Sequence, residues 1–245
     1  MSLLNTVKTD DSIKDEKDSV GNSGPLESAL YPFEVSTAYL EKKASGALFM
    51  NLSLVTDDGR TIKQGLCLAS GDAKGNKNYY ENQQGERHYL PGFNHGNSLA
   101  LLTVGKELAE LDTEEKVVNV YSADAGAEVP TKVEMVMDLL GKRGIVGLQK
   151  QIVDKQAKGD DGKYHNTGDT REVNEIDKFF REKDKMTTAE IRAGAEEPQF
   201  YATWDQKWTG QTRNRASAAN DSNGAAGAPK AAAGGSTKPT KSLFG

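Results

Sequence analysis

Hydrophobic and polar residues alternate along much of the chain, and this period of two is typical of β-strands. The clearest example is the segment 31–40, in which Phe33, Val35, Thr37 and Tyr39 are predicted to share one face. The same alternation predicts further strands and one additional hairpin. The strands are predicted over residues 47–56, 60–69, 116–121, 144–155 and about 171–180, and the additional hairpin over 74–90.

Other segments have the period of a helix. Residues 97–104 predict a short helix, and residues 130–140, which begin with Pro and end before Gly141, predict a second one. Thr187-Thr188-Ala189-Glu190 is a capping-box pattern that indicates the start of another helix. Toward the end of the folded part, Phe200, Trp204 and Trp208 recur every fourth residue, so an amphipathic helix is predicted whose aromatic stripe packs on the sheet. Base stacking by Trp204 or Trp208 is the alternative.

The predicted fold is mainly β with inserted helices and a C-terminal helix. The order of elements fits a five-stranded Greek-key barrel of the oligonucleotide-binding (OB) type, which has a helix between its third and fourth strands. A half-open β-sandwich fits the pattern as well. We expect residues 1–28 to form a flexible N-terminal arm and residues 29–210 to form the OB-fold domain. Residues 211–245 are expected to form a disordered basic tail.

The tail ends in Leu243-Phe244-Gly245 after a long tether of Ala, Gly, Ser, Thr, Asn and Pro residues. Because no local core is available to this apolar pair, we interpret it as a short peptide for a groove on a partner protein. A frayed chain end without a function is the alternative.

Composition changes this picture little, but the distribution of charge matters. The chain has 245 residues, which is long enough to bury a core without disulfides or a metal, and its net charge is −5. Cys67 is the single cysteine, so neither an intramolecular disulfide nor a thiolate zinc site can form. The sequence contains no apolar run of about 18 residues, so it predicts no membrane span, and the expected location is the cytoplasm. The acidic net charge hides a basic C-terminal stretch, because residues 209–245 hold five basic residues and one acidic residue.

Residues that could carry chemistry do not form a catalytic pattern. His88, His95 and His165 lack the spacing of a metal site, and Cys67 falls in a strand that is predicted to be buried. The sequence therefore predicts a protein that is not an enzyme and that uses no cofactor and no metal.

Basic and aromatic residues, in contrast, are interleaved in two stretches. Single-stranded nucleic acid requires this mixture, because cations track the phosphates and aromatic faces stack on the bases. In OB barrels the face of the second and third strands and the loops after the first and fourth strands carry the contacts, and residues 156–170 would be the last of these loops. Cross-strand packing is the alternative role for Tyr79 and Tyr80. The candidate DNA-binding residues are Lys63, Lys74, Lys77, Tyr79, Tyr80, Arg87, Tyr89, Lys142, Arg143, Lys150, Lys158, Tyr164 and Arg171.

Several longer stretches are similar to one known family. They include YPFEVSTAY at 31–39, LLGKRGIVGLQKQIVDK at 139–155, NTGDTREVNEIDKFFR at 166–181 and the closing KSLFG. In these stretches the chain resembles the single-stranded DNA-binding proteins of podophages that package their own virion RNA polymerase. No single motif is diagnostic, and the resemblance depends on their combination over nearly the whole chain.

The resemblance implies a protein that coats single-stranded DNA during replication and recombination and supports transcription through a contact with RNA polymerase. Its partners would be single-stranded DNA, RNA polymerase and phage replication proteins in the infected bacterial cell. The polymerase contact maps onto Lys238, Lys241, Leu243 and Phe244. Bacterial proteins of this class usually end in an acidic tail, whereas this tail is basic. The alternative function is a transcription activator that acts only through the polymerase, with incidental DNA binding.

Overall fold

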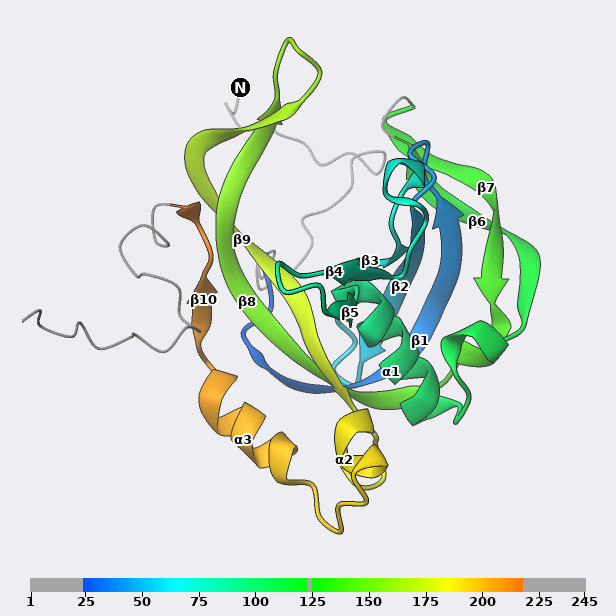
Figure 1. Ribbon diagram of the computed structural model, residues 1–245, viewed down its shortest axis with the longest axis vertical. Helices are drawn as coiled ribbons and strands as arrows, with labels where there is room; N and C mark the ends of the chain where they lie inside the picture. The colour runs from blue at the N-terminus through cyan, green and yellow to red at the C-terminus, as the bar shows by residue number, and fades with distance from the viewer. Residues whose placement is uncertain (1–23, 123–124, 218–245) are drawn as a thin grey trace, which may run out of the picture.

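The computed structural model describes residues 24–122 and 125–217, and Lys238, Lys241, Leu243 and Phe244 therefore lie outside the described residues. The fold is mainly β, as predicted, and is built on one large, strongly curved sheet (Figure 1). Five of its strands are β1 (Ala29–Lys42), β2 (Leu48–Thr56), β3 (Thr61–Ala69), β8 (Arg143–Lys158) and β9 (Tyr164–Phe180).

These five strands are antiparallel and lie in the order β3, β2, β1, β8, β9. The first half of β1 pairs with β8, and its second half pairs with β7 (Ala127–Val136), which in turn pairs with β6 (Thr113–Ser122). The short strand β10 (Thr212–Asn214) adds to β8 in parallel, within a stretch that the sequence assigned to the tail.

The predicted barrel closure would require pairing between β3 and β9, and the sheet is open there. The side chain of Gln64 bridges the two strands instead. Its Oε1 atom accepts a hydrogen bond from the backbone N–H of Ile176 at 2.7 Å, and its Nε2 atom donates to Oε1 of Glu175 at 2.9 Å. The mainly β fold is thus confirmed, whereas a closed five-stranded barrel is not.

A β-bulge in β1 corrects the predicted facing of its side chains. The pairing with β2 shifts between Val35 and Thr37, so that Val35 and Ala38 are both buried. Phe33 and Val35 point into the core as predicted. Thr37 and Tyr39, however, point to the opposite, outward face, because one extra residue reverses the alternation.

The helix predicted over residues 130–140 is wrong. This segment continues β7 to Val136 and ends in the 3-10 helix η4 (Met137–Leu139). The alternation of Val133 and Met135, which are both buried, is that of a strand, and it outweighs the flanking Pro130.

The other predicted helices are present. They are α1 (Pro91–Thr103), which begins six residues earlier than predicted, α2 (Thr188–Arg192) and α3 (Gln199–Trp208). The capping box of α2 is confirmed, because Thr187 Oγ1 accepts from Glu190 N–H and the Glu190 carboxylate accepts from Thr187 N–H. The predicted additional hairpin is formed by β4 (Tyr79–Glu81) and β5 (Arg87–Tyr89), preceded by the 3-10 helix η2 (Asp72–Lys74). Another 3-10 helix, η3 (Leu108–Glu110), follows α1.

The main core lies between the inner face of the curved sheet and α1, which contributes Leu99 and Leu102. The helix α3 packs on the opposite face of β8, where Trp204 is 1% exposed and donates from Nε1 to Asp177 at 2.7 Å. Gly147 permits this approach, because a Cβ atom there would lie 2.8 Å from the indole ring. Within the described residues, no helix combines the length and the apolar character needed to cross a membrane.

Candidate nucleic-acid interface

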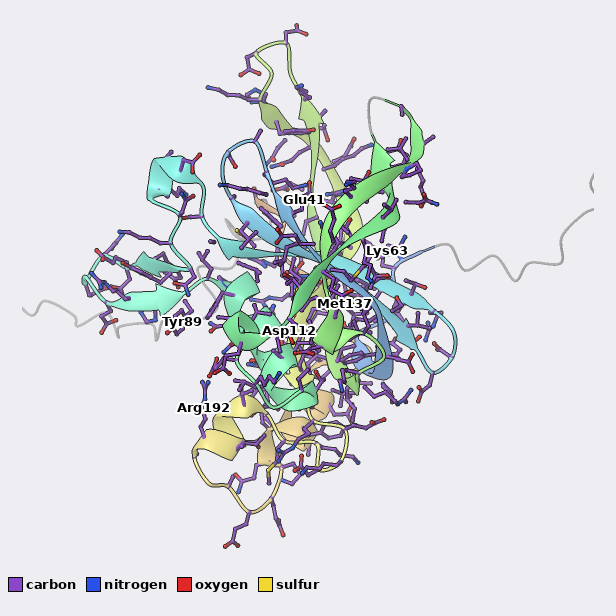
Figure 2. The ribbon with its side chains drawn as sticks, turned by 90° about the vertical axis from the view of Figure 1, so that its right-hand side faces the viewer. Glu41, Lys63, Tyr89, Asp112, Met137 and Arg192 are labelled. Atoms are coloured by element: carbon purple, nitrogen blue, oxygen red, sulfur yellow. The ribbon has the colours of Figure 1, made fainter. Side chains whose placement is uncertain are left out.

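A groove lies on the outward face of β1, β2 and β3, and we call it the β1–β3 groove. Its volume is about 760 Å³, and the β6–β7 hairpin forms one wall. Figure 2 shows this hairpin crossing in front of the strands that carry Glu41 and Lys63. The lining residues are Thr37, Tyr39, Glu41, Lys43, Asn51, Leu52, Ser53, Lys63, Gln64, Gly65, Val118, Asn119, Val120, Tyr121 and Glu128.

The floor of this groove follows from the alternation of the strands. On β3, Ile62 and Leu66 are buried in the core, so Lys63 and Gly65 point outward. On β1 the bulge turns Tyr39 to the same side. Gly65 leaves the floor open, because nothing closer than 3.4 Å would meet a Cβ atom at its position.

A second hollow of about 640 Å³, which we call the β4 hollow, adjoins the first. The two meet where Phe49, which lines the β4 hollow, lies 3.7 Å from a Cβ position on Gly65. Four of the predicted DNA-binding residues line the β4 hollow: Lys74, Lys77, Tyr79 and Tyr80. The structure therefore places Lys63 in the β1–β3 groove and four residues of the first predicted cluster in the neighbouring β4 hollow.

The β4–β5 hairpin carries the remaining two residues of that cluster, Arg87 and Tyr89. Tyr79 pairs with Tyr89 across the two strands, which supports the cross-strand packing role. The ring of Tyr79 is also approached by two cations, Lys77 Nζ at 5.4 Å and Arg87 Cζ at 5.1 Å from its centroid. Tyr80 and Tyr89 remain 48% and 56% exposed, so their rings are accessible to a ligand.

Three lysines near this surface could bind an anion without first losing an ion pair to another described residue. Lys63, Lys74 and Lys77 form no ion pair with any residue in the described ranges. By contrast, Lys43 lies 2.5 Å from Glu41. The hydrogen bond from Lys43 holds the pKa of the Glu41 carboxyl below its usual value, and Asn51 adds a second hydrogen bond at 2.7 Å. Because unpaired ammonium groups lose no partner when they bind phosphate, they are the better candidates for backbone contacts.

Sequence reasoning missed several members of this surface. The sequence predicts one shared face for Tyr39 and Phe33, and it predicts a strand over residues 47–56 without a binding role for Phe49. Tyr121, at the end of the predicted strand 116–121, is 66% exposed and lines the β1–β3 groove. The alternation of residues 47–56 could have identified Phe49 and Asn51 as outward-facing, whereas only the bulge explains Tyr39.

The second predicted cluster is dispersed by the fold. Arg143 is held by Asp57 at 2.8 Å and by Glu182 at 3.0 Å, and these hydrogen bonds raise the pKa of its guanidinium. Lys150 is only 15% exposed and lies between Glu27 at 3.0 Å and Glu172 at 3.2 Å. Neither cation lines the groove or the hollow, and both are occupied by carboxylates.

The rest of that cluster is exposed but separate. Lys158 and Tyr164 are directly paired near the end of the β8–β9 hairpin, which projects from the body in Figure 1, and Tyr164 is 68% exposed. Arg171 is exposed on β9, and Lys142 is exposed at the start of β8. This projecting hairpin is thus a second basic and aromatic surface, distinct from the β1–β3 groove.

Two observations complete the description. Within the residues that the structure describes, no group of three or more His, Cys, Asp and Glu side chains is arranged to hold a metal ion. Compared with known proteins, the chain matches no family model and no curated sequence. The function must therefore be argued from the geometry and chemistry of the surface itself.

Proposed function

We propose that the protein binds single-stranded DNA along the β1–β3 groove and the adjoining β4 hollow. The observation that supports this proposal is a set of lysines that form no ion pair within the described residues, combined with accessible aromatic rings in two neighbouring hollows. Lys63, Lys74 and Lys77 would neutralise phosphates, and Tyr80 and Tyr121 would stack on bases, at about 1–3 kcal/mol per base.

The arrangement of strands supports the same proposal. The order β3, β2, β1, β8, β9, with α1 following β3, corresponds to the strand order of an OB fold, and Gln64 bridges β3 and β9, between which the sheet is open. In that architecture, oligonucleotides bind across the second and third strands, which here form the groove floor. The projecting β8–β9 hairpin stands where the fourth-to-fifth loop would be, so that Lys158 and Tyr164 would contact the strand as it leaves the groove.

In the cell, this activity corresponds to coating single-stranded phage DNA during replication and recombination. We further propose that the C-terminal peptide with Lys238, Lys241, Leu243 and Phe244 contacts RNA polymerase and so supports transcription. The alternative, an activator for which DNA binding is incidental, requires no such groove on the body of the protein.

The lysines provide the test. Lys63→Ala and Lys77→Ala should each weaken binding to a fluorescent oligo-dT severalfold and lower the slope of log affinity against log salt by about 0.7 for each lost phosphate contact. Lys183→Ala, which removes an exposed lysine at a distant turn, is the matched control and should leave affinity and slope unchanged. Equal affinities for all three variants and the unmodified chain would contradict the proposal.

A further inference from the structure

Within the part of the chain that the structure describes, the outer edge of β6 is a long strand edge without a partner. Within residues 24–122 and 125–217, β6 pairs only with β7. Its register with β7 is continuous over ten residues, and it contains neither Pro nor Gly. Proteins usually protect such edges with bulges, prolines, charges or covering segments, because an open edge is a template for another strand.

The orientation of the edge groups follows from the partner strand. Asn119 lies opposite Pro130, which has no N–H to donate. This pair therefore fits the non-hydrogen-bonded position of an antiparallel ladder, in which the N–H and C=O groups of both residues point away from each other. Since orientation alternates along a strand, Val117, Asn119 and Tyr121 all present their backbone groups to the open edge.

The side chains of the same residues are unusually exposed. Val117 is 63% exposed and Tyr121 is 66% exposed, and both rank among the most exposed large apolar side chains of the described chain. No charged residue lies between them. The charges of β6 are confined to its first half, where Lys116 pairs with Glu114 at 2.6 Å and Glu115 pairs with Lys132 at 2.7 Å.

This edge is complementary to itself. If two copies pair antiparallel with Asn119 opposite the partner's Asn119, then Val117 lies opposite the partner's Tyr121, and Tyr121 opposite the partner's Val117. All three pairs use outward-facing backbone groups, and each pair of a β-branched with an aromatic residue is favourable. Shifting the centre to residue 118 places Glu115 opposite Tyr121, and shifting it to 117 places Glu115 opposite Asn119, so among these three registers only the one centred on Asn119 places Val117 opposite Tyr121.

We propose that β6 pairs with β6 of a second copy of this chain, antiparallel and centred on Asn119. The paired segment is short and covers less surface than the roughly 1,200 Å² that stable interfaces bury. The pair is therefore weak, and it dissociates at low protein concentration. Because Val118 and Tyr121 also line the β1–β3 groove, pairing would bring two grooves to one interface, a consequence that rests on the proposed function.

Disulfide trapping without DNA tests the register, so that its result does not depend on the proposed function. In the full chain with Cys67→Ser, Asn119→Cys should form a covalent dimer under oxidised glutathione. The Cα atoms of a hydrogen-bonded pair are about 5.5 Å apart, within the range of about 4.4–6.8 Å that disulfides require. Val117→Cys alone and Tyr121→Cys alone should not form dimers, because their copies would be offset by roughly 13 Å along the strands. A mixture of these two variants should form the mixed dimer.

Gln83→Cys, at the exposed tip of the β4–β5 hairpin, measures random collision. Dimers of Asn119→Cys that form at least tenfold faster than those of Gln83→Cys, together with the mixed dimer, would support the proposal. Equal rates for the two, or self-crosslinking of Val117→Cys as fast as the mixed reaction, would overturn it. Sedimentation over a concentration series is the independent check, in which Val117→Lys should abolish the rise in average mass seen for the unmodified chain.

Discussion

Gly65→Val is the substitution that separates binding in the groove from folding of the domain. Gly65 lies on the exposed floor of the β1–β3 groove, and a Cβ atom there would lie 3.4 Å from Asn51 Oδ1 and 3.7 Å from Phe49 Cδ1. Both distances are ordinary van der Waals contacts, so a Cβ atom fits without displacing its neighbours, and we expect the two methyl groups of valine to extend into the groove. Because glycine in a strand costs about 0.5–1 kcal/mol relative to alanine, the free energy of unfolding should rise by a similar amount. In a domain of this size the melting temperature should then rise by about 1–4 °C.

Binding should change in the opposite direction. Two methyl groups on the groove floor would occupy the space of a base beside Phe49 and Tyr39. The loss of one stacked base corresponds to about 1–3 kcal/mol, or roughly a 5- to 150-fold loss of affinity. Differential scanning fluorimetry and fluorescence anisotropy with oligo-dT measure the two effects on the same sample.

Thr61→Val is the matched control, because it adds an apolar side chain to the outward face of the same strand but outside the groove. It should leave affinity unchanged. If Gly65→Val raised the melting temperature and bound oligo-dT as tightly as the unmodified chain, the groove would not be the binding surface. A large drop in melting temperature would instead refute the expectation that the floor has room for a side chain.

Two further predictions concern stability. Gly147→Ala should lower the free energy of unfolding by about 1–3 kcal/mol in urea denaturation, because its Cβ atom would lie 2.8 Å from Trp204, whereas Gly24→Ala, with open space around it, should have no effect. Burial lowers the pKa of His95, so the folded state favours the neutral ring. The free energy of unfolding should therefore be highest above about pH 6.5. It should fall below that pH, because the ring of the unfolded chain takes up a proton there. This loss of unfolding free energy approaches about 1.4 kcal/mol for each unit by which the pKa is lowered. The pH dependence should disappear in His95→Gln and persist in His88→Gln, as measured by denaturation between mildly acidic and neutral pH.

Much of the fold could be predicted because the strands are amphipathic. The hairpin at Asp58-Gly59 is a good example, because this dipeptide is a hairpin signal, Gly59 has a φ of +79°, and Thr56 N–H donates to the carbonyl of Arg60 across the turn. In the segment 130–140 the Pro and the Gly at its ends indicate a helix, but the alternation of Val133 and Met135 is that of a strand, and the strand forms. Val133 and Met135 pack in the core, whereas Pro130 lies at a strand position where no backbone N–H donor is required.

The candidate site could be predicted only in part, because two of its determinants are not local in sequence. The bulge after Val35 turns the side chain of Tyr39 to the opposite face of the sheet, and no residue pattern in β1 predicts this bulge. Lys150 was a reasonable phosphate contact by its charge, but the fold brings Glu27 from 123 residues away to neutralise it. Local clusters such as Lys74 to Tyr80 survive folding, whereas clusters assembled from a long hairpin depend on which carboxylates the rest of the chain places beside them.

The most direct measurement of the central claim is a titration of the full chain with oligo-dT and with duplex DNA of equal length across a salt series. If single-stranded DNA binds in the groove, the chain should prefer the single strand to the duplex, because the aromatic rings of the groove require unstacked bases, and its affinity should fall steadily as salt increases. Equal affinity for the duplex, or binding that salt does not weaken, would contradict this proposal.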